Sequence, residues 1–184
     1  MIFSSIEFIV FFIIFIFSIR FLKKLQQNFI ILFSLFFYAF WNISFVLLIL
    51  YFCITTYLSI KKNDYLKSSI FLIILPLVYF KYSSFLFNSL HLNNFSLLAY
   101  EGEIPLAISF ITFTAIAAIV DTKKKIFDKS SVNFYSISEF ILFFPQLIAG
   151  PILRLNELLP QLKNNITFKK ENIKFGLILF TIGF

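Results

Sequence analysis

The stretch FFPQLIAGPILR, residues 143–154, places two prolines and a glycine in a run that is otherwise as apolar as a membrane span. Pro145 and Pro151 each lack a backbone N–H, and Gly150 between them adds conformational freedom. A helix is therefore expected to break here. Inside lipid, the freed backbone groups need partners from protein, water or a ligand. The break thus predicts either the lining of a cavity or a re-entrant turn.

Two polar side chains accompany this break. Gln146 supplies an amide that can bond the broken backbone or contact a substrate. Arg154 closes the stretch, where a phosphate or the membrane interface could hold its guanidinium. A cavity wall and a plain turn anchored by an arginine fit these residues equally well.

The composition of the whole chain is that of an integral membrane protein. Its 184 residues are 60% hydrophobic, include 30 Phe and are only 14% charged, with a mean hydropathy of +0.92. The charges cluster between apolar runs of about 18 to 22 residues, near the length that a helix needs to cross the hydrocarbon core. We expect an all-α multi-pass integral membrane protein with about five to six transmembrane helices, a re-entrant or broken helix and a cytoplasmic amphipathic segment.

The apolar runs and their interruptions predict the helices. The spans are expected near residues 2–22, 29–40, 44–60, 70–90 and 105–121, followed by a helix over residues 138–144. Leucines interleaved with polar residues predict the amphipathic segment over residues 155–163. The final run, FGLILFTIGF, begins another apolar segment, which is expected to continue beyond residue 184.

The basic residues mark one side of the membrane. They follow the first, third and fifth spans, whereas the loop after the fourth span carries Glu101 and Glu103 but no lysine or arginine. The positive-inside rule places the basic loops in the cytoplasm and the N-terminus outside. The net charge of +7 is thereby explained by topology, and no nucleic-acid partner is expected.

Four residues in or beside the spans could have either a functional or a purely structural role. Lys81 lies in the middle of the fourth span, where an ammonium costs roughly 2.5 to 3.5 kcal/mol; it should face the protein interior or a water-filled cavity, as an anion site or a structural pair. Glu139 is expected to open its helix and stabilise the positive N-terminal end. His91, the only histidine, has no partner at a catalytic spacing. Cys53 predicts a packed apolar residue and no metal site.

Several stretches together resemble the membrane-bound O-acyltransferase family, in particular its bacterial branch of alginate and peptidoglycan O-acetyltransferases. These are FFPQLIAGPILRLNELLPQL, ISFITFTAIAAIVD, FYAFWN and KYSSF. The resemblance implies a multi-pass protein of the bacterial inner (cytoplasmic) membrane, folded around a central tunnel. It implies acetyl-CoA or another acyl thioester as a cytoplasmic donor, no bound cofactor, and an extracytoplasmic polysaccharide or peptidoglycan hydroxyl as acceptor. A periplasmic or extracellular acyltransferase partner is also implied.

The resemblance also suggests site residues. The cavity or donor entrance would be lined by Lys81, Pro145, Gln146, Gly150, Pro151 and Arg154, and the adjacent helix would contribute Ser109, Phe110 and Thr112. The catalytic histidine of the family lies in later helices, so no catalytic residue is expected here. Residues 1–184 would be a single membrane domain, the N-terminal part of a larger acyltransferase, and inactive alone. The alternatives are a small non-enzymatic membrane carrier or scaffold and an inactive remnant of an interrupted gene.

Overall fold

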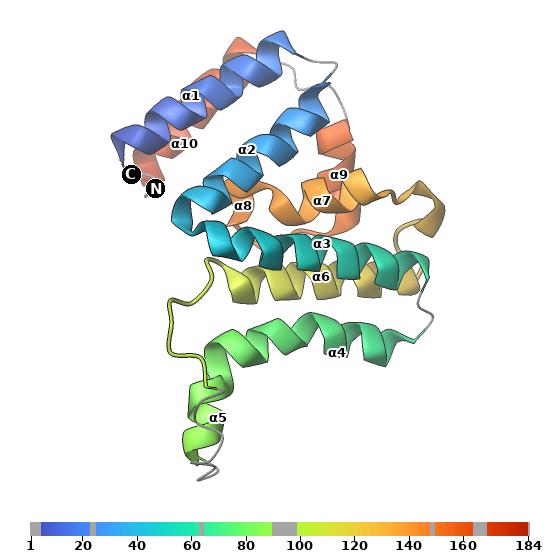
Figure 1. Cartoon of the computed structure of the whole chain (residues 1–184). Coiled ribbons are helices and arrows are strands. Elements are labelled where there is room, and N and C mark those ends of the chain that lie inside the picture. Colours follow the sequence, from blue (N-terminus) through green and yellow to red (C-terminus); the bar gives the residue numbers. More distant parts are fainter. Residues whose placement is uncertain are drawn as a thin grey trace.

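The computed structural model describes residues 5–22, 25–62, 65–89, 99–147, 150–163 and 169–183. Within these ranges the chain forms helices and no strands (Figure 1), which confirms the all-α prediction. The α-helices are α1 (Ile6–Phe21), α2 (Gln26–Trp41), α3 (Val46–Lys61), α4 (Leu66–Leu77), α5 (Ser83–Ser89), α6 (Ile108–Lys123), α7 (Phe134–Leu142), α8 (Phe144–Leu147), α9 (Leu155–Lys163) and α10 (Lys170–Gly183).

Side-chain caps decide where several of these helices begin. The predicted interruption at Trp41 and Asn42 is confirmed: α2 ends there, and the Asn42 side chain accepts a hydrogen bond from the Ser44 N–H at 2.9 Å to start the next helical stretch. Asn and Ser favour such positions because their oxygens satisfy N–H groups that have no partner within the helix.

Two predicted helix limits were wrong. Asn133 caps α7 by accepting from the Ser136 N–H, so this helix begins at Phe134 rather than near residue 138. Glu139 consequently lies inside the helix, completely buried, and not at its N-terminal end. The helix expected from Pro105 begins three residues later, because Ala107 adopts a left-handed conformation with φ of 55°.

The fourth predicted span is continuous but irregular. A π-helical turn over Val78–Tyr82 joins α4 to α5 and contains Lys81. It begins two residues after Pro76, a buried proline that cannot donate a helical hydrogen bond. Such single π turns often occur at functional positions.

Two helical stretches are long and apolar enough to cross a membrane. They are Ile43–Lys61, with 19 residues, and Leu66–Phe87, with 22 residues. The apolar helices α1, α2 and α6 have 16 residues each, about 24 Å at 1.5 Å per residue, less than the hydrocarbon thickness of roughly 30 Å. By length and composition the structure therefore supports two of the five to six expected spans.

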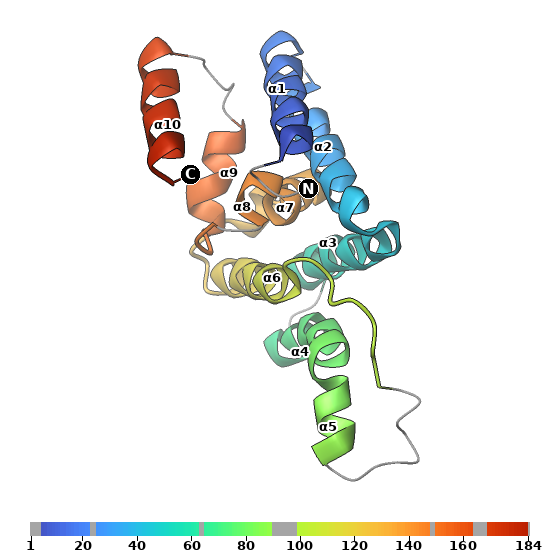
Figure 2. The ribbon, with the colours of Figure 1, turned by 90° about the vertical axis from the view of Figure 1, so that its left-hand side faces the viewer.

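The centre of the fold is a layer of α3 and α6. These two helices run in the same direction, α4 covers one side of them antiparallel, and α7 packs on α3 from the other side (Figures 1 and 2). The C-terminal ends of α3 and α6 therefore lie together, and the Lys61 Nζ donates to the Lys129 carbonyl at 2.9 Å. Two of the lysine-containing loops thus meet at one end of the molecule, which we call the basic end.

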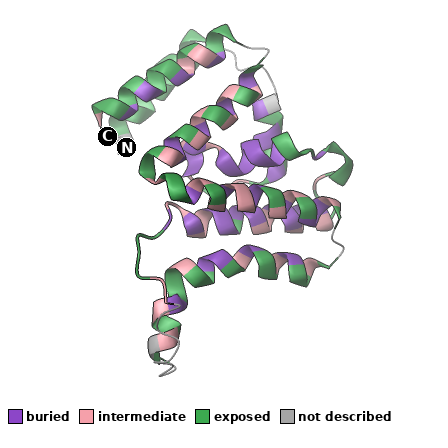
Figure 3. Ribbon diagram, in the orientation of Figure 1, coloured by how far each residue is buried: buried purple, intermediate pink, exposed green. Residues whose placement is uncertain are grey.

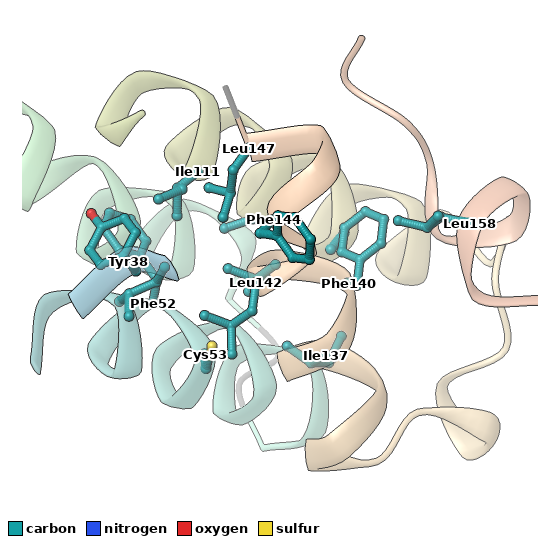
Figure 4. Packing of buried hydrophobic residues seen from close by; sticks show 14 of the residues in the cluster. Tyr38, Phe52, Cys53, Ile111, Ile137, Phe140, Leu142, Phe144, Leu147 and Leu158 are labelled. Carbon is teal, nitrogen blue, oxygen red and sulfur yellow. The ribbon is translucent and has the colours of Figure 1, made fainter. Parts of the chain in front are cut away.

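The short helix α7 is the most enclosed element. Each residue from Ser136 to Leu142 is buried, whereas α1 and α10 are largely exposed (Figure 3). Figure 4 shows buried side chains of α7 and α8 meeting those of α2, α3, α6 and α9. Cys53 is fully buried among them, as predicted.

The amphipathic prediction for α9 is confirmed. Its four leucines are buried, and its polar residues Asn156, Glu157 and Gln161 are exposed. The apolar face packs against α7, so protein rather than lipid covers it. The Gln26 side chain donates to the Leu162 carbonyl at 3.0 Å and ties the end of α9 to the start of α2.

Candidate functional site

The predicted helix break falls between α7 and α8. Phe143 leaves the helical conformation, with φ −48° and ψ 93°, and Pro145 lies in the first turn of α8, where the missing N–H costs little. The N–H of Phe144 donates to the hydroxyl of Ser34 in α2 at 3.3 Å. A side chain from another helix thus satisfies a backbone group that the break leaves without a helical partner.

Phe144 also anchors the break in the core. Its ring is fully buried, and its centroid lies 4.8 Å from Phe15, 5.2 Å from Phe11 and 5.4 Å from Phe37. Aromatic rings at these separations gain stability beyond the area that they bury. Helices α1 and α2 therefore hold the break in position.

Gln146 and Gly150 close the turn after the break. The Gln146 Nε2 donates to the Pro151 carbonyl at 2.9 Å, and the Gly150 N–H donates to the Gln146 carbonyl at 3.1 Å. A Cβ on Gly150 would lie 2.7 Å from the Gln146 Cγ. Among the described residues φ is negative at every glycine, so Gly150 meets a demand for space, not for a left-handed backbone.

The amide oxygen of Gln146 has no hydrogen-bond partner among the described residues. This atom, Oε1, is buried, and the whole residue is only 7% exposed, so bulk water does not replace the missing donor. A buried acceptor without a partner is costly. Gln146 is therefore a polar group that a bound molecule or water could satisfy.

Arg154 brings the chain back to the basic end. Its Nη1 lies 4.0 Å from the Oδ1 of Asp121 in the last turn of α6. The Asp121 side chain is 7% exposed and that of Arg154 57%. Since α7 starts beside the loop that contains Lys129, the chain enters and leaves the core at one end. We call α7, α8 and residues 150–154 the re-entrant segment.

The start of α9 fixes the backbone of Arg154. The Glu157 carboxylate accepts from the Arg154 N–H at 3.1 Å, while the Glu157 and Leu158 N–H groups donate to the Arg154 carbonyl. This is one half of a capping box, the bond from the N3 carboxylate to the N-cap N–H; arginine has no side-chain acceptor to supply the other half. Helix α9 thereby holds Arg154 opposite Asp121.

Lys81 does not join this group. Its Nζ lies 3.4 Å from the Ser109 hydroxyl in the first turn of α6 and 5.7 Å from the centre of the Tyr82 ring, and its side chain is exposed. Ser109 and Asp121 are twelve residues apart on one helix, about 18 Å. Lys81 and Arg154 therefore lie toward opposite ends of α6.

The remaining candidates are placed as follows. Thr112 is buried and its hydroxyl donates to the Ile108 carbonyl at 2.7 Å, whereas Phe110 is half-buried. Pro151 is exposed. His91 lies outside the described residues. The structure thus brings Gln146, Gly150 and Pro151 together; their role in lining a cavity stays a prediction.

Sequence reasoning missed Ser34 and Asp121. Ser34 lies in an apolar helix and shows its role only through a contact 110 residues along the chain. Asp121 was read as the end of a span. The signal was an acidic residue just before a run of lysines. A negative charge is unfavourable near a helix C-terminus, so it indicates a positively charged partner.

Comparison with known proteins gives relatives of two kinds. The chain is 35% identical over 192 residues to a peptidoglycan O-acetyltransferase of Helicobacter pylori, covering 84% of this chain and 36% of that protein. It is 27% identical over 202 residues to the probable alginate O-acetylase AlgI of Pseudomonas aeruginosa, covering 100% of this chain and 38% of that protein. The chain thus spans less than two fifths of the length of these relatives. No protein-family model and no solved structure matches it.

Proposed function

Because the chain belongs to the membrane-bound O-acyltransferase family, in its bacterial branch of peptidoglycan and alginate O-acetyltransferases, we propose that it forms part of a membrane O-acetyltransferase. The enzyme transfers an acetyl group from a cytoplasmic thioester donor, acetyl-CoA or another acyl thioester, to hydroxyls of an extracytoplasmic polysaccharide or peptidoglycan. The likeness to these two kinds of O-acetyltransferase carries the proposal. Residues 1–184 act in it as one membrane domain.

The arrangement of charge supports a multi-pass topology in the cytoplasmic membrane. Two long apolar stretches flank the loop of Lys62, and the loop of Lys129 meets the end of α3 at the same end of the molecule. Basic loops gathered at one end are typical of the cytoplasmic face. In this orientation the N-terminus lies outside.

The re-entrant segment would shape the donor entrance. It starts and ends at the basic end, and Arg154 is held there by Asp121 with much of its side chain exposed. Gln146 presents its free amide oxygen deeper in the protein. These residues position the donor; the chemistry itself is assigned to no residue of this chain.

Lys81 belongs to the other half of the pathway. It lies beside the first turn of α6, which is the outer end in the proposed orientation. There an exposed ammonium would face the acceptor side, where a periplasmic or extracellular acyltransferase partner would complete transfer to the polymer.

Acetate bound as ester in the cell envelope tests this function. The gene is deleted in its own bacterium and restored in its natural form, as Gln146→Ala or as Gln161→Ala. Gln161 is the matched control, because it is an exposed glutamine whose amide donates to the Glu157 carbonyl one turn back. Acetate released by mild alkali from purified peptidoglycan and exopolysaccharide is then measured.

We expect the deletion to lower ester-bound acetate in one of the two polymers. The natural gene and Gln161→Ala should restore it, and Gln146→Ala should restore it only in part. Unchanged acetate in both polymers after deletion would refute the proposed function.

A further inference from the structure

A cavity of about 430 Å³ lies at the basic end of the molecule. Its walls come from the ends of α3 and α6 and from the loop that follows α6: Ile60, Thr122, Lys123, Lys125, Phe127, Asp128 and Lys129. Its volume falls in the range of small-molecule sites, roughly 300 to 1,000 Å³. None of the residues assigned to the donor entrance lines it.

The lining is strongly basic on one side and apolar on the other. Three of the lining residues are lysines and one is an aspartate. Asp128 is engaged within the loop, since its carboxylate accepts from both the N–H and the hydroxyl of Ser130. Ile60 and Phe127 supply the apolar wall. The lysines therefore dominate the electrostatics of the cavity.

Lys125 is held in a conformation that favours another residue. Its φ is 59°, in the left-handed region. The Ile126 N–H donates to the Asp121 carbonyl at 2.9 Å and the Lys125 N–H to the Thr122 carbonyl at 3.1 Å. These two bonds form a Schellman motif, in which the left-handed position is usually glycine.

A lysine at this position costs conformational energy that a glycine would avoid. Strained residues of this kind cluster at ligand sites. The strained residue, Lys125, lines the cavity together with two further lysines. Backbone strain, charge and cavity thus coincide at Lys125.

From this coincidence we propose that the cavity binds the phosphate group of an organic phosphate ester. Several ammonium groups can donate to one phosphate at once, because a phosphate monoester offers three oxygens outside its ester link and a diester offers two. The apolar wall accommodates the organic substituent. Two sources share this chemistry: a soluble nucleotide and the headgroup of an anionic phospholipid.

Binding of two probes to the purified natural protein tests the proposal. In the first arm, adenosine 3′,5′-bisphosphate is titrated calorimetrically into protein in neutral phosphatidylcholine nanodiscs. In the second, phosphatidylglycerol is titrated in detergent and bound lipid is counted by native mass spectrometry. Wild type is compared with Lys125→Gly and Lys124→Ala, and thermal unfolding is recorded for each.

Lys125→Gly removes one lining ammonium and relieves the left-handed strain. It should therefore raise the unfolding temperature while weakening the binding of at least one probe by about tenfold, as expected for one hydrogen bond to a charged group. Lys124→Ala is the matched control: it removes the neighbouring charge, which does not line the cavity. Lys124→Ala should leave the dissociation constant of each probe within about twofold of the wild-type value, a much smaller change than the one expected for Lys125→Gly.

The probe whose binding Lys125→Gly weakens identifies the source of the phosphate. The proposal is refuted if neither probe binds the wild type, if Lys125→Gly binds as tightly as wild type, or if both variants lose binding equally. The nucleotide arm rests on the proposed function, because adenosine 3′,5′-bisphosphate is part of coenzyme A, whereas the lipid arm does not. Binding in either arm would still stand if deletion of the gene left ester-bound acetate unchanged, so the two proposals can fail separately.

Discussion

Arg154 and Asp121 join two stretches of the chain that are 33 positions apart, with 4.0 Å between Nη1 and Oδ1. The Asp121 side chain is buried, and more than half of the Arg154 side chain is exposed. The Oδ2 of Asp121 is buried and accepts no hydrogen bond from the described residues. Arg154 is therefore the group that makes the buried carboxylate tolerable, and the pair fixes the return of the re-entrant segment to α6.

The variant Arg154→Ala should destabilise the protein by about 1 kcal/mol, more than a pair between two exposed residues and less than one that is fully buried. It leaves the Asp121 charge without its cation. Adding Asp121→Asn should recover part of the loss, because the neutral amide no longer needs a positive partner. The measurement is the free energy of unfolding of wild type, both single variants and the double variant. Additive effects of the two substitutions would show that the residues are not coupled.

Local pattern was sufficient for much of the fold. The apolar runs, the interruption at Asn42, the break at Pro145 and the amphipathic leucines of α9 each reflect a preference of the residues themselves. These features depend on near neighbours in the chain. The structure accordingly places them within a few residues of the expected positions.

The features that sequence did not predict depend on distant contacts or on strain. The pairing of Asp121 with Arg154 and of Ser34 with Phe144 requires the helices to be assembled first. The left-handed Lys125 contradicts the rule that glycine ends such helices. The start of α7 is an exception, because Asn133 three residues before Ser136 is a readable cap.

The variant Ser34→Ala should lower the free energy of unfolding by about 1 to 3 kcal/mol, the cost of leaving a buried N–H without a partner. The N–H in question belongs to Phe144 and donates to the Ser34 hydroxyl. Ser68→Ala is the control, because Ser68 is exposed and its hydroxyl donates to the Tyr65 carbonyl within the same turn. Denaturant unfolding measures both. Equal losses would mean that Ser34 does not support the helix break.

The loop at the basic end should respond to acid through Asp128. Hydrogen bonds from the side chain and backbone of Ser130 hold the pKa of Asp128 below its usual value of 3.8. Because the folded pKa is depressed, the carboxylate stabilises the loop fully above that usual, unfolded pKa. This stabilisation is lost as the pH falls through the lower folded value.

Amide hydrogen exchange of Ser130 and Ser136 checks this response. After correction for intrinsic rates, protection of Ser130 should fall as the pH drops below about 4. Protection of Ser136 should change less, because its cap is the neutral side chain of Asn133. Asp128→Asn should remove the difference between the two sites. A parallel loss at both residues would point to general unfolding instead of titration of Asp128.

The closeness of Gly150 to Gln146 makes the sharpest prediction for the re-entrant segment. A Cβ at position 150 would lie 2.7 Å from the Gln146 Cγ, 3.0 Å from its carbonyl oxygen and 3.1 Å from its Cα. The carbonyl oxygen and Cα belong to the backbone, so rotating the Gln146 side chain cannot relieve these two contacts. Gly150→Ala should therefore destabilise the protein by about 1 to 3 kcal/mol, the usual cost of overpacking.

Gly176→Ala is the matched control for this substitution. A Cβ there meets nothing within 4 Å, and the residue lies inside α10, where alanine favours the helix over glycine by up to about 1 kcal/mol. The two variants should thus change the free energy of unfolding in opposite directions. Combining Gly150→Ala with Gln146→Ala should restore only a small part of the loss, because the backbone contacts remain. Full recovery in the double variant would show that the Gln146 side chain alone, and not the close approach of the two backbones, requires glycine at this turn.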